Sequence, residues 1–421
     1  MTTSADNDKI PTAAAASKHD DNPVAPSPVD SEFADIAPYD DRQFHARLER
    51  LSREPGFEHA VRFIMPGVDF EDFRRNLLQV RDQHDFQTRI MGGFLMHLEK
   101  MTTSGVSADG AENICDGRSY TFMSNHRDIV LDASFLNLCL LRFGKPLTQV
   151  AIGNNLLIYE WISDLVKLNR SFIVKRNVRP LEALNAARQL SAYIHFTINK
   201  KNESVWIAQR EGRTKDSNDM TQESLVKMLG IAGEGNMVDH IAEINLLPVS
   251  ISYEYDPNDY LKVREYLLKR RNPEYKKCQH DDLLSMETGL TGFKGRVHFH
   301  FGRCINEDLS RIPVDIRTQN SAASRQTVTK SVCRIIDRTI HTGYHFYPIN
   351  YIAFDWLEGS SRFAGHYTDK DVDGFENYVA QQLAKVNVDD VTEDEAVFMR
   401  RTLLSMYANP VRNQLAARSN D

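Results

Sequence analysis

A histidine and two aspartates stand close together where a long apolar segment of the sequence begins. The stretch from Ser124 to Asp132 contains His126, Asp128 and Asp132, and the residues that follow, up to Leu141, are mostly apolar. This spacing suits general base catalysis, in which an imidazole takes a proton from a hydroxyl group while a carboxylate holds the ring in one tautomer. A histidine beside an aspartate is also a common surface pair, so the segment alone leaves both interpretations open.

The order His126-Arg127-Asp128 also resembles the catalytic loop of protein kinases. That loop carries an asparagine five residues after its aspartate, where this chain has Ala133. It also requires a glycine-rich phosphate-binding loop upstream, and the sequence contains none. We therefore exclude a kinase.

A second block is basic. Arg170, Lys175 and Arg176 flank the apolar run 171–174 and form a local positive patch in a chain whose net charge is −7. Arginine can hold a phosphate by two parallel hydrogen bonds, and lysine acts as a point charge beside it. The alternative is a solvated basic loop.

Two more blocks are associated with β-forming runs: one follows such a run and the other lies within one. Glu211, Gly212 and Arg213 come after the run 205–208, and the glycine allows the backbone to turn tightly. The two charged residues could pair with each other or hold a polar substrate. Pro248 lies in the apolar run 246–253, and because proline lacks a backbone donor it belongs at the start of a strand or at a sheet edge. Taken singly, each block could be an ordinary strand or strand end.

In this order the four blocks resemble the motifs of the glycerophospholipid acyltransferase family, which includes lysophosphatidate and glycerol-3-phosphate acyltransferases. The family pattern is Asn-His-x4-Asp, then a Phe-Ile-x-Arg type block, then Glu-Gly-x-Arg, then an apolar block built on proline. The resemblance covers residues 119–255, about a third of the chain. It implies that His126 is the general base and that Pro248 shapes the acyl pocket. The expected substrate-binding residues are Asn125, Arg170, Lys175, Arg176, Glu211, Gly212, Arg213 and Pro248.

Two departures from the family pattern change these expectations. Five residues, not four, separate His126 from Asp132. One extra helical residue turns a side chain by about 100° and shifts it by about 1.5 Å, so Asp132 can orient His126 only if the loop absorbs the difference. We favour Asp132 because it matches the family order, with Asp128 as the alternative. The third block also lacks the residue between Gly212 and Arg213 of the family pattern, which leaves more of the phosphate role to the second block.

The resemblance implies an acyltransferase that moves a fatty acyl group from acyl-CoA or acyl carrier protein onto a lysophospholipid in phospholipid biosynthesis. The expected acceptor is 1-acyl-sn-glycerol-3-phosphate. Glycerol-3-phosphate, a lyso-aminolipid, hydrolysis of the thioester and an inactive lipid-binding relative remain alternatives. No metal and no cofactor are expected, and no cysteine or serine is placed to form a covalent acyl-enzyme.

The elements that must position these residues indicate an α/β fold with a mixed β-sheet flanked by helices. Strands are predicted at 119–123, 171–174, 204–208, 246–253 and 295–301, with helices at 132–141 and 180–194 between them. Residues 1–40 are rich in Ala, Asp, Pro and Ser and are expected to form a disordered tail. We predict a helical N-terminal region at 41–101, a catalytic core at 102–310 and a helical C-terminal region at 311–421.

Composition limits the possible partners and the cellular location of the protein. The net charge of −7 argues against nucleic acid as a partner. Five scattered cysteines without framework spacing indicate reduced thiols. The chain begins without a signal-like apolar segment, and no window offers about 18 uncharged apolar residues. We therefore expect a cytoplasmic protein that lies on the inner face of the membrane. Residues 41–100 could form a lipid platform, although packing on the core is favoured. The oligomeric state stays open.

Overall fold

The computed structural model describes residues 32–232, 235–319 and 321–419, so most of the predicted tail lies outside the described part. A seven-stranded sheet has the order β1-β7-β6-β2-β5-β3-β4. The five strands from β6 to β4 run parallel, whereas β7 is antiparallel to β6 and parallel to β1. The strands are β1 (Val106–Asp109), β2 (Thr121–Ser124), β3 (Gln149–Gly153), β4 (Ser171–Val174), β5 (Val205–Ala208), β6 (Leu246–Tyr253) and β7 (Val297–Phe301). The predicted α/β class with a mixed sheet is confirmed.

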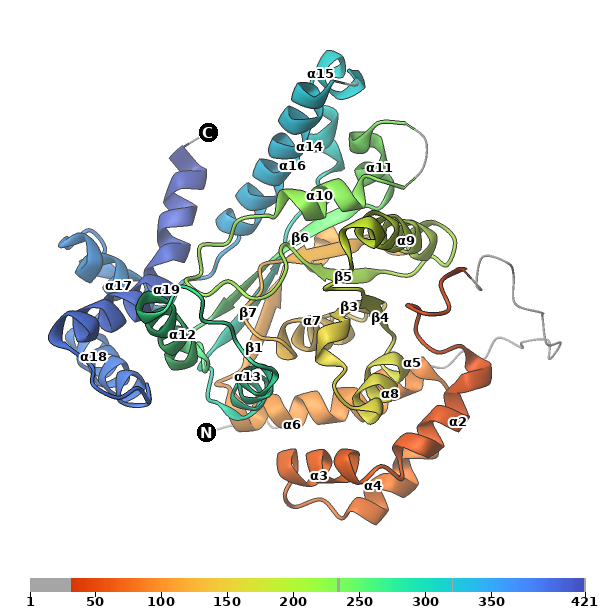
Figure 1. Cartoon of the computed structure of the whole chain (residues 1–421), viewed down its shortest axis with the longest axis horizontal. Coiled ribbons are helices and arrows are strands. Elements are labelled where there is room, and N and C mark those ends of the chain that lie inside the picture. The colour runs from red at the N-terminus through yellow and green to blue at the C-terminus, as the bar shows by residue number, and fades with distance from the viewer. Residues whose placement is uncertain (1–31, 233–234, 320, 420–421) are drawn as a thin grey trace, which may run out of the picture.

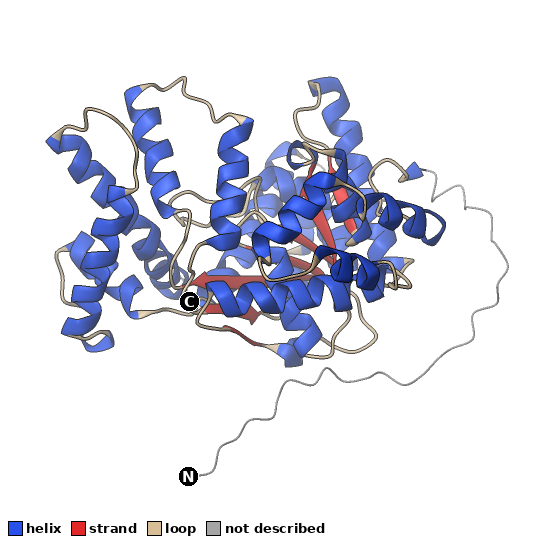
Figure 2. Cartoon of the chain, turned by 90° about the horizontal axis from the view of Figure 1, so that it is seen from below, coloured by secondary structure: helices blue, strands red, loops and turns tan. Residues whose placement is uncertain are grey.

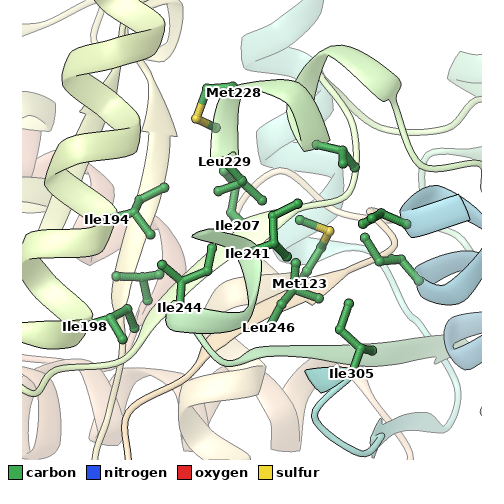
Figure 3. Close-up of a cluster of buried hydrophobic side chains, with 14 of the residues drawn as sticks. Met123, Ile194, Ile198, Ile207, Met228, Leu229, Ile241, Ile244, Leu246 and Ile305 are labelled. Atoms are coloured by element: carbon green, nitrogen blue, oxygen red, sulfur yellow. The ribbon is translucent and has the colours of Figure 1, made fainter. Parts of the chain in front are cut away.

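Both faces of the sheet are covered by helices, which explains why most of the parallel strands are rich in apolar residues (Figure 1). On one face lie α6 (Gly92–Thr102) and α7 (Leu131–Arg142). The other face carries α9 (Pro180–Asn199), α10 (Glu223–Leu229), α11 (Met237–Glu243) and α16 (Ala322–Thr342). Figure 3 shows side chains of this second core, among them Ile194 and Ile198 of α9, gathered against Met123, Ile207 and Leu246 of the sheet.

A small helical layer precedes the sheet. It consists of α2 (Asp41–Leu51), α3 (Pro55–Ile64), α4 (Phe70–Leu77), α5 (Gln83–Asp85) and the π-helical turn η1 (Phe86–Met91). Its core contains Phe44, Phe57 and Phe70, and it packs on Leu168 of α8 (Glu160–Leu168). Figure 1 shows α3 and α4 beyond α8, at the bottom of the view. Most of the apolar side chains of this layer are therefore used in packing.

The predicted tail is wrong for residues 32–40. Phe33 and Ile36 are 4% and 2% exposed and belong to the main core. The Phe33 ring lies 5.3 Å from the ring of Tyr193. The backbone N–H of Ile173 donates to the carbonyl oxygen of Ile36 at 2.9 Å, so this segment covers the free edge of β4. Because the segment both buries apolar surface and pairs a sheet edge, it is part of the fold.

The C-terminal helices do not divide at residue 310 as predicted. α16 packs on β6 and α10 as well as on α19, and its buried apolar side chains belong to the main core of the sheet. Conversely, α12 (Asp259–Arg271) joins α17 (Pro348–Glu358), α18 (Asp369–Ala384) and α19 (Glu393–Ser419) in a separate helical cluster. Figures 1 and 2 both show this cluster to one side of the sheet. In the described part of the chain, the remaining α-helices are α13 (Gln279–Thr291), α14 (Asn306–Ser310) and α15 (Val314–Thr318), and three short 3-10 turns are η2 (Ala111–Asn113), η3 (Asn154–Leu156) and η4 (Ala364–His366). Within the described ranges, no helix has both the length and the apolar character needed to cross a bilayer.

Candidate active site

The sequence blocks meet at one edge of the sheet. His126 follows the end of β2, Arg176 follows β4, and Glu211 follows β5. Because these strands are parallel, their carboxyl ends lie at the same edge, where ligands of open α/β sheets usually bind. Residues about 35 to 85 positions apart in the sequence therefore border one cavity.

His126 is held by Asp132. The His126 Nδ1 atom lies 2.8 Å from Asp132 Oδ2, and the same oxygen accepts the backbone N–H groups of Arg127 at 2.6 Å and Asp128 at 3.0 Å. Asp132 is fully buried, and the His126 ring meets the Trp206 ring edge-on at 5.8 Å. With its proton on Nδ1, the imidazole presents Nε2 as the atom that can accept a proton from a substrate.

The extra residue of the first motif is absorbed before α7 begins. Asp128 Oδ1 accepts the backbone N–H groups of Val130 at 2.9 Å and Leu131 at 2.8 Å, so Asp128 caps the first turn of the helix. Burial and the neighbouring Asp132 carboxylate raise the pKa of Asp128. Asp132 is therefore the carboxylate that the structure places against His126, and Asp128 supports the helix that carries it.

Asn125 fixes the other side of the same loop. Its side-chain amide donates to the carbonyl oxygen of Ile251 at 2.9 Å and accepts the Ile251 N–H at 2.8 Å. The side chain is completely buried. Both of its polar atoms are thus used to tie the end of β2 to β6, and Asn125 orients the loop instead of contacting a substrate.

A cavity of about 610 Å³ opens beside His126. Its walls are mainly apolar and come from both sides of the sheet. Ala133, Leu138 and Val150 belong to the core on the α7 side, whereas Leu190 and Met228 belong to the core under α9 and α10. The volume is in the range of ligand-binding pockets.

Cationic groups border the cavity near Glu211. Arg176 Nε lies 3.7 Å from Glu211 Oε1, and the backbone N–H of Arg176 donates to Asn154 Oδ1 at 2.8 Å. Arg176 passes so close to Gly153 that a Cβ atom there would lie 2.7 Å from its Nε. Lys175 also borders the cavity.

Not all of this positive charge is free to meet a ligand. The Lys175 ammonium group pairs with Asp35 at 2.5 Å and donates to Gln189 at 2.9 Å.

Arg210, which is not among the residues predicted from the sequence, lines the cavity too. Its position directly before Glu211 at the end of β5 was the signal that could have identified it.

Several predicted site residues lie elsewhere. Arg170 precedes β4, at the opposite edge of the sheet, and pairs with Glu203 at 2.6 Å. Pro248 stands beside Met123 inside the sheet and does not border the cavity. The expected roles of Arg170 in phosphate binding and of Pro248 in the acyl pocket are therefore not supported.

The third block divides at its glycine. Gly212 has a φ of +69° and turns the chain, which separates Glu211 at the cavity from Arg213. Arg213 is buried and acts electrostatically on Asp128 and Asp256. Among the residues that the structure describes, no three His, Cys, Asp or Glu side chains are grouped to hold a metal ion.

Comparison by sequence finds no matching protein-family model and no matching curated protein. One solved structure that is similar is that of the 1-acyl-sn-glycerophosphate (LPA) acyltransferase PlsC from Thermotoga maritima. The two chains are 16% identical, and the match covers 69% of this chain and 95% of that one with a TM-score of 0.33. The interpretation of the site therefore rests on its own geometry.

Proposed function

We propose that this protein is an O-acyltransferase that moves a fatty acyl group from a thioester donor onto the hydroxyl group of a lysophospholipid. The donor would be acyl-CoA or acyl carrier protein, and the acceptor 1-acyl-sn-glycerol-3-phosphate, in phospholipid biosynthesis. The observation that carries the proposal is the His126–Asp132 pair beside a large apolar cavity whose border carries arginines.

The residues supply the proton transfers that the reaction needs. The acceptor oxygen attacks the thioester carbonyl carbon while His126 Nε2 takes the hydroxyl proton, and Asp132 stabilises the imidazolium that forms. When the carbon–sulfur bond breaks, the imidazolium returns the proton to the departing thiolate. The products are an ester and a free thiol, and no acyl-enzyme intermediate is required.

The shape of the cavity favours an acceptor that already carries an acyl chain. Apolar walls extend from both core layers of the sheet, so the cavity beside His126 offers apolar surface from two separate parts of the fold. A donor acyl chain needs one such surface, and glycerol-3-phosphate has no chain to occupy a second. Arg176 and Arg210 border the cavity and would attract the phosphate of the acceptor.

Exposed apolar residues adjoin the cavity and suit contact with a membrane surface. Leu181 and Leu184 are 92% and 51% exposed on α9, on either side of Ala183, which lines the cavity. Tyr159 is 54% exposed and stacks on Trp161, another cavity residue. We infer that this part of the chain rests on the cytoplasmic face of the membrane, where its lipid substrate would enter.

The function is tested with purified protein, labelled acyl-CoA and each acceptor in turn, by following free thiol and lipid product together. We expect both to appear with 1-acyl-sn-glycerol-3-phosphate and to be lost in His126→Ala. Thiol release without any acceptor would indicate a hydrolase, and lipid binding without thiol release an inactive relative. Full activity of His126→Ala would overturn the mechanism.

Membrane contact is tested by flotation with vesicles that contain anionic phospholipid. Leu181→Asp combined with Leu184→Asp should reduce the bound fraction severalfold, because charged groups would have to enter the apolar interface. Val397→Asp is the matched control, since Val397 is 69% exposed on α19 and does not border the cavity. Equal loss in both variants would refute the assigned surface.

A further inference from the structure

Three buried polar atoms behind His126 have no hydrogen-bond partner within the described residues. They are Oδ1 of Asp132, Oδ2 of Asp128 and the hydroxyl group of Tyr253. The opposite oxygen of Asp132, by contrast, accepts three hydrogen bonds. Leaving a buried polar group without a partner costs about 1–3 kcal/mol. Only one of the two oxygens of the Asp132 carboxylate, Oδ2, is therefore fixed by hydrogen bonds.

Strand pairing brings Tyr253 to this position. β2 and β6 pair with Ser124 beside Val249, and the Asn125 amide binds both backbone groups of Ile251. Tyr253 is the last residue of β6, two positions farther on, so it lies beside the loop that follows Asn125. Burial, and after it the nearby carboxylates of Asp132 and Asp128, raise the pKa of Tyr253. The hydroxyl group therefore keeps its proton and can donate.

The surroundings of Tyr253 leave the hydroxyl group room to adjust. A cavity of about 30 Å³ borders its side chain, together with Arg127, Asp256 and Tyr344. The Asp132 and Tyr253 groups are complementary, since one is a carboxylate oxygen and the other a hydroxyl donor. A side-chain hydrogen bond with Asp132 is among the causes that raise the pKa of Tyr253, so the two groups lie near hydrogen-bond reach.

We propose that Tyr253 is a positioning residue for acyl transfer, whose hydroxyl group donates to Asp132 Oδ1 and keeps Oδ2 directed at His126. This inference rests on the proposed function. It gives the His126–Asp132 pair a third member from a strand that none of the charged sequence blocks identified. Tyr253 does not border the substrate cavity, so its effect passes entirely through Asp132.

The charged groups that surround Asp132 and Tyr253 have other interactions. Asp128 faces Asp132 from the same loop and uses one oxygen to cap α7. Arg213, from the segment after β5, and Lys294, from the segment before β7, act on Asp128. Asp256, which follows β6, acts on Tyr253 but is paired with Lys262. Tyr253 is thus the neutral donor in this set, and removing its hydroxyl group changes no formal charge.

Tyr253→Phe tests the inference. Losing one hydrogen bond to a carboxylate should lower kcat about three- to tenfold, with KM for donor and acceptor unchanged. Without this donor the Asp132 carboxylate keeps more of its negative charge and stabilises protonated His126 more strongly. The acidic limb of the plot of kcat against pH should therefore move to higher pH. Because the phenylalanine also removes an unpartnered hydroxyl group, Tm should stay constant or rise.

Tyr193→Phe is the matched control. Tyr193 is also buried, but it belongs to the core on the other face of the sheet, and its hydroxyl group donates to Gln149 at 2.6 Å. This variant should lower Tm and leave kcat and the pH profile unchanged. Unchanged kcat and pH profile in Tyr253→Phe would overturn the inference, as would a loss of activity that parallels a loss of Tm.

Failure of the proposed function would be recognised separately. It would appear as absence of thiol release by the wild-type protein with every acceptor. The pKa of His126, followed by NMR titration of its imidazole, tests Tyr253 without any turnover. A higher His126 pKa in Tyr253→Phe than in the wild type supports the contact with Asp132, and an identical pKa refutes it.

Discussion

Replacing Asp132 by asparagine tests the assignment of the catalytic carboxylate. An asparagine side chain fills nearly the same volume, and its oxygen can still accept the N–H groups of Arg127 and Asp128. What it loses is the negative charge beside the imidazolium that forms during acyl transfer. Asp128→Asn is the matched variant, because it removes the same charge from a buried carboxylate four residues earlier.

The structure sets the size of the expected effect. His126 Nδ1 and Asp132 Oδ2 are 2.8 Å apart in a buried environment, so the two charge centres lie about 4 Å apart. At an effective dielectric constant of about 20, unit charges at this separation attract by about 4 kcal/mol. Because each 1.36 kcal/mol is a factor of ten in rate, Asp132→Asn should lower kcat by about 10³. Asp128→Asn removes only part of a helix cap, so we expect a loss of up to about 1 kcal/mol of stability and less than a tenfold loss of kcat.

The assay is single-turnover release of free thiol from acyl-CoA with saturating 1-acyl-sn-glycerol-3-phosphate, with Tm recorded for both variants. A fall of less than threefold in Asp132→Asn would refute the role of Asp132. Equal falls in both variants, with Tm unchanged, would show that the two carboxylates act as a unit.

Three further predictions follow from other parts of the molecule. Gly153→Ala places a methyl group against Arg176, so KM for the phosphate-bearing acceptor should rise severalfold with little change in kcat; Gly374→Ala, which meets no neighbour, is the control for steady-state kinetics. Burial and a neighbouring carboxylate raise the pKa of Asp259 to about 7. Its contribution to stability is therefore fully present below about pH 4 and is lost as the pH rises to 7, by up to about 4 kcal/mol in total and about 3 kcal/mol between pH 5 and pH 8. In Asp259→Asn this loss should disappear, which thermal melts at pH 5 and pH 8 measure. Phe33→Ala should lower the free energy of unfolding by about 3 kcal/mol in urea titrations, whereas an unchanged midpoint would contradict its place in the core.

Much of the sheet could be predicted from the sequence, because buried parallel strands are short apolar runs between polar segments. β4, β5 and β6 lie within a residue of their predicted bounds, and β2 within two. β1 and β3 were not predicted. β1 contains serine and aspartate, β3 contains glutamine and ends in glycine, and neither shows the continuous apolar character of its neighbours.

The helical flanks were predicted as regions but divided at the wrong places. Helical spacing identifies an amphipathic helix, but it does not say which surface the apolar stripe covers. Only the packing shows that α16 belongs to the sheet and α12 to the C-terminal cluster. Likewise, the composition of residues 32–40 resembles a tail, and the burial of Phe33 and Ile36 depends on surfaces far away in the sequence.

The sequence alone identifies the chemical groups of the site: a histidine with nearby carboxylates, and charged residues beside short buried strands. The tertiary structure decided which of these groups can act together. Arg170 and Arg176 flank the same strand, but a parallel sheet presents only its carboxyl edge to the site, so Arg176 borders the cavity and Arg170 does not. The spacing of the first motif left Asp128 and Asp132 as alternatives. The choice between them depends on hydrogen-bond directions in the turn before α7. There Asp128 caps the helix, and Asp132 accepts the hydrogen bond from His126. Such directions arise from three-dimensional contacts, which spacing along the chain does not encode.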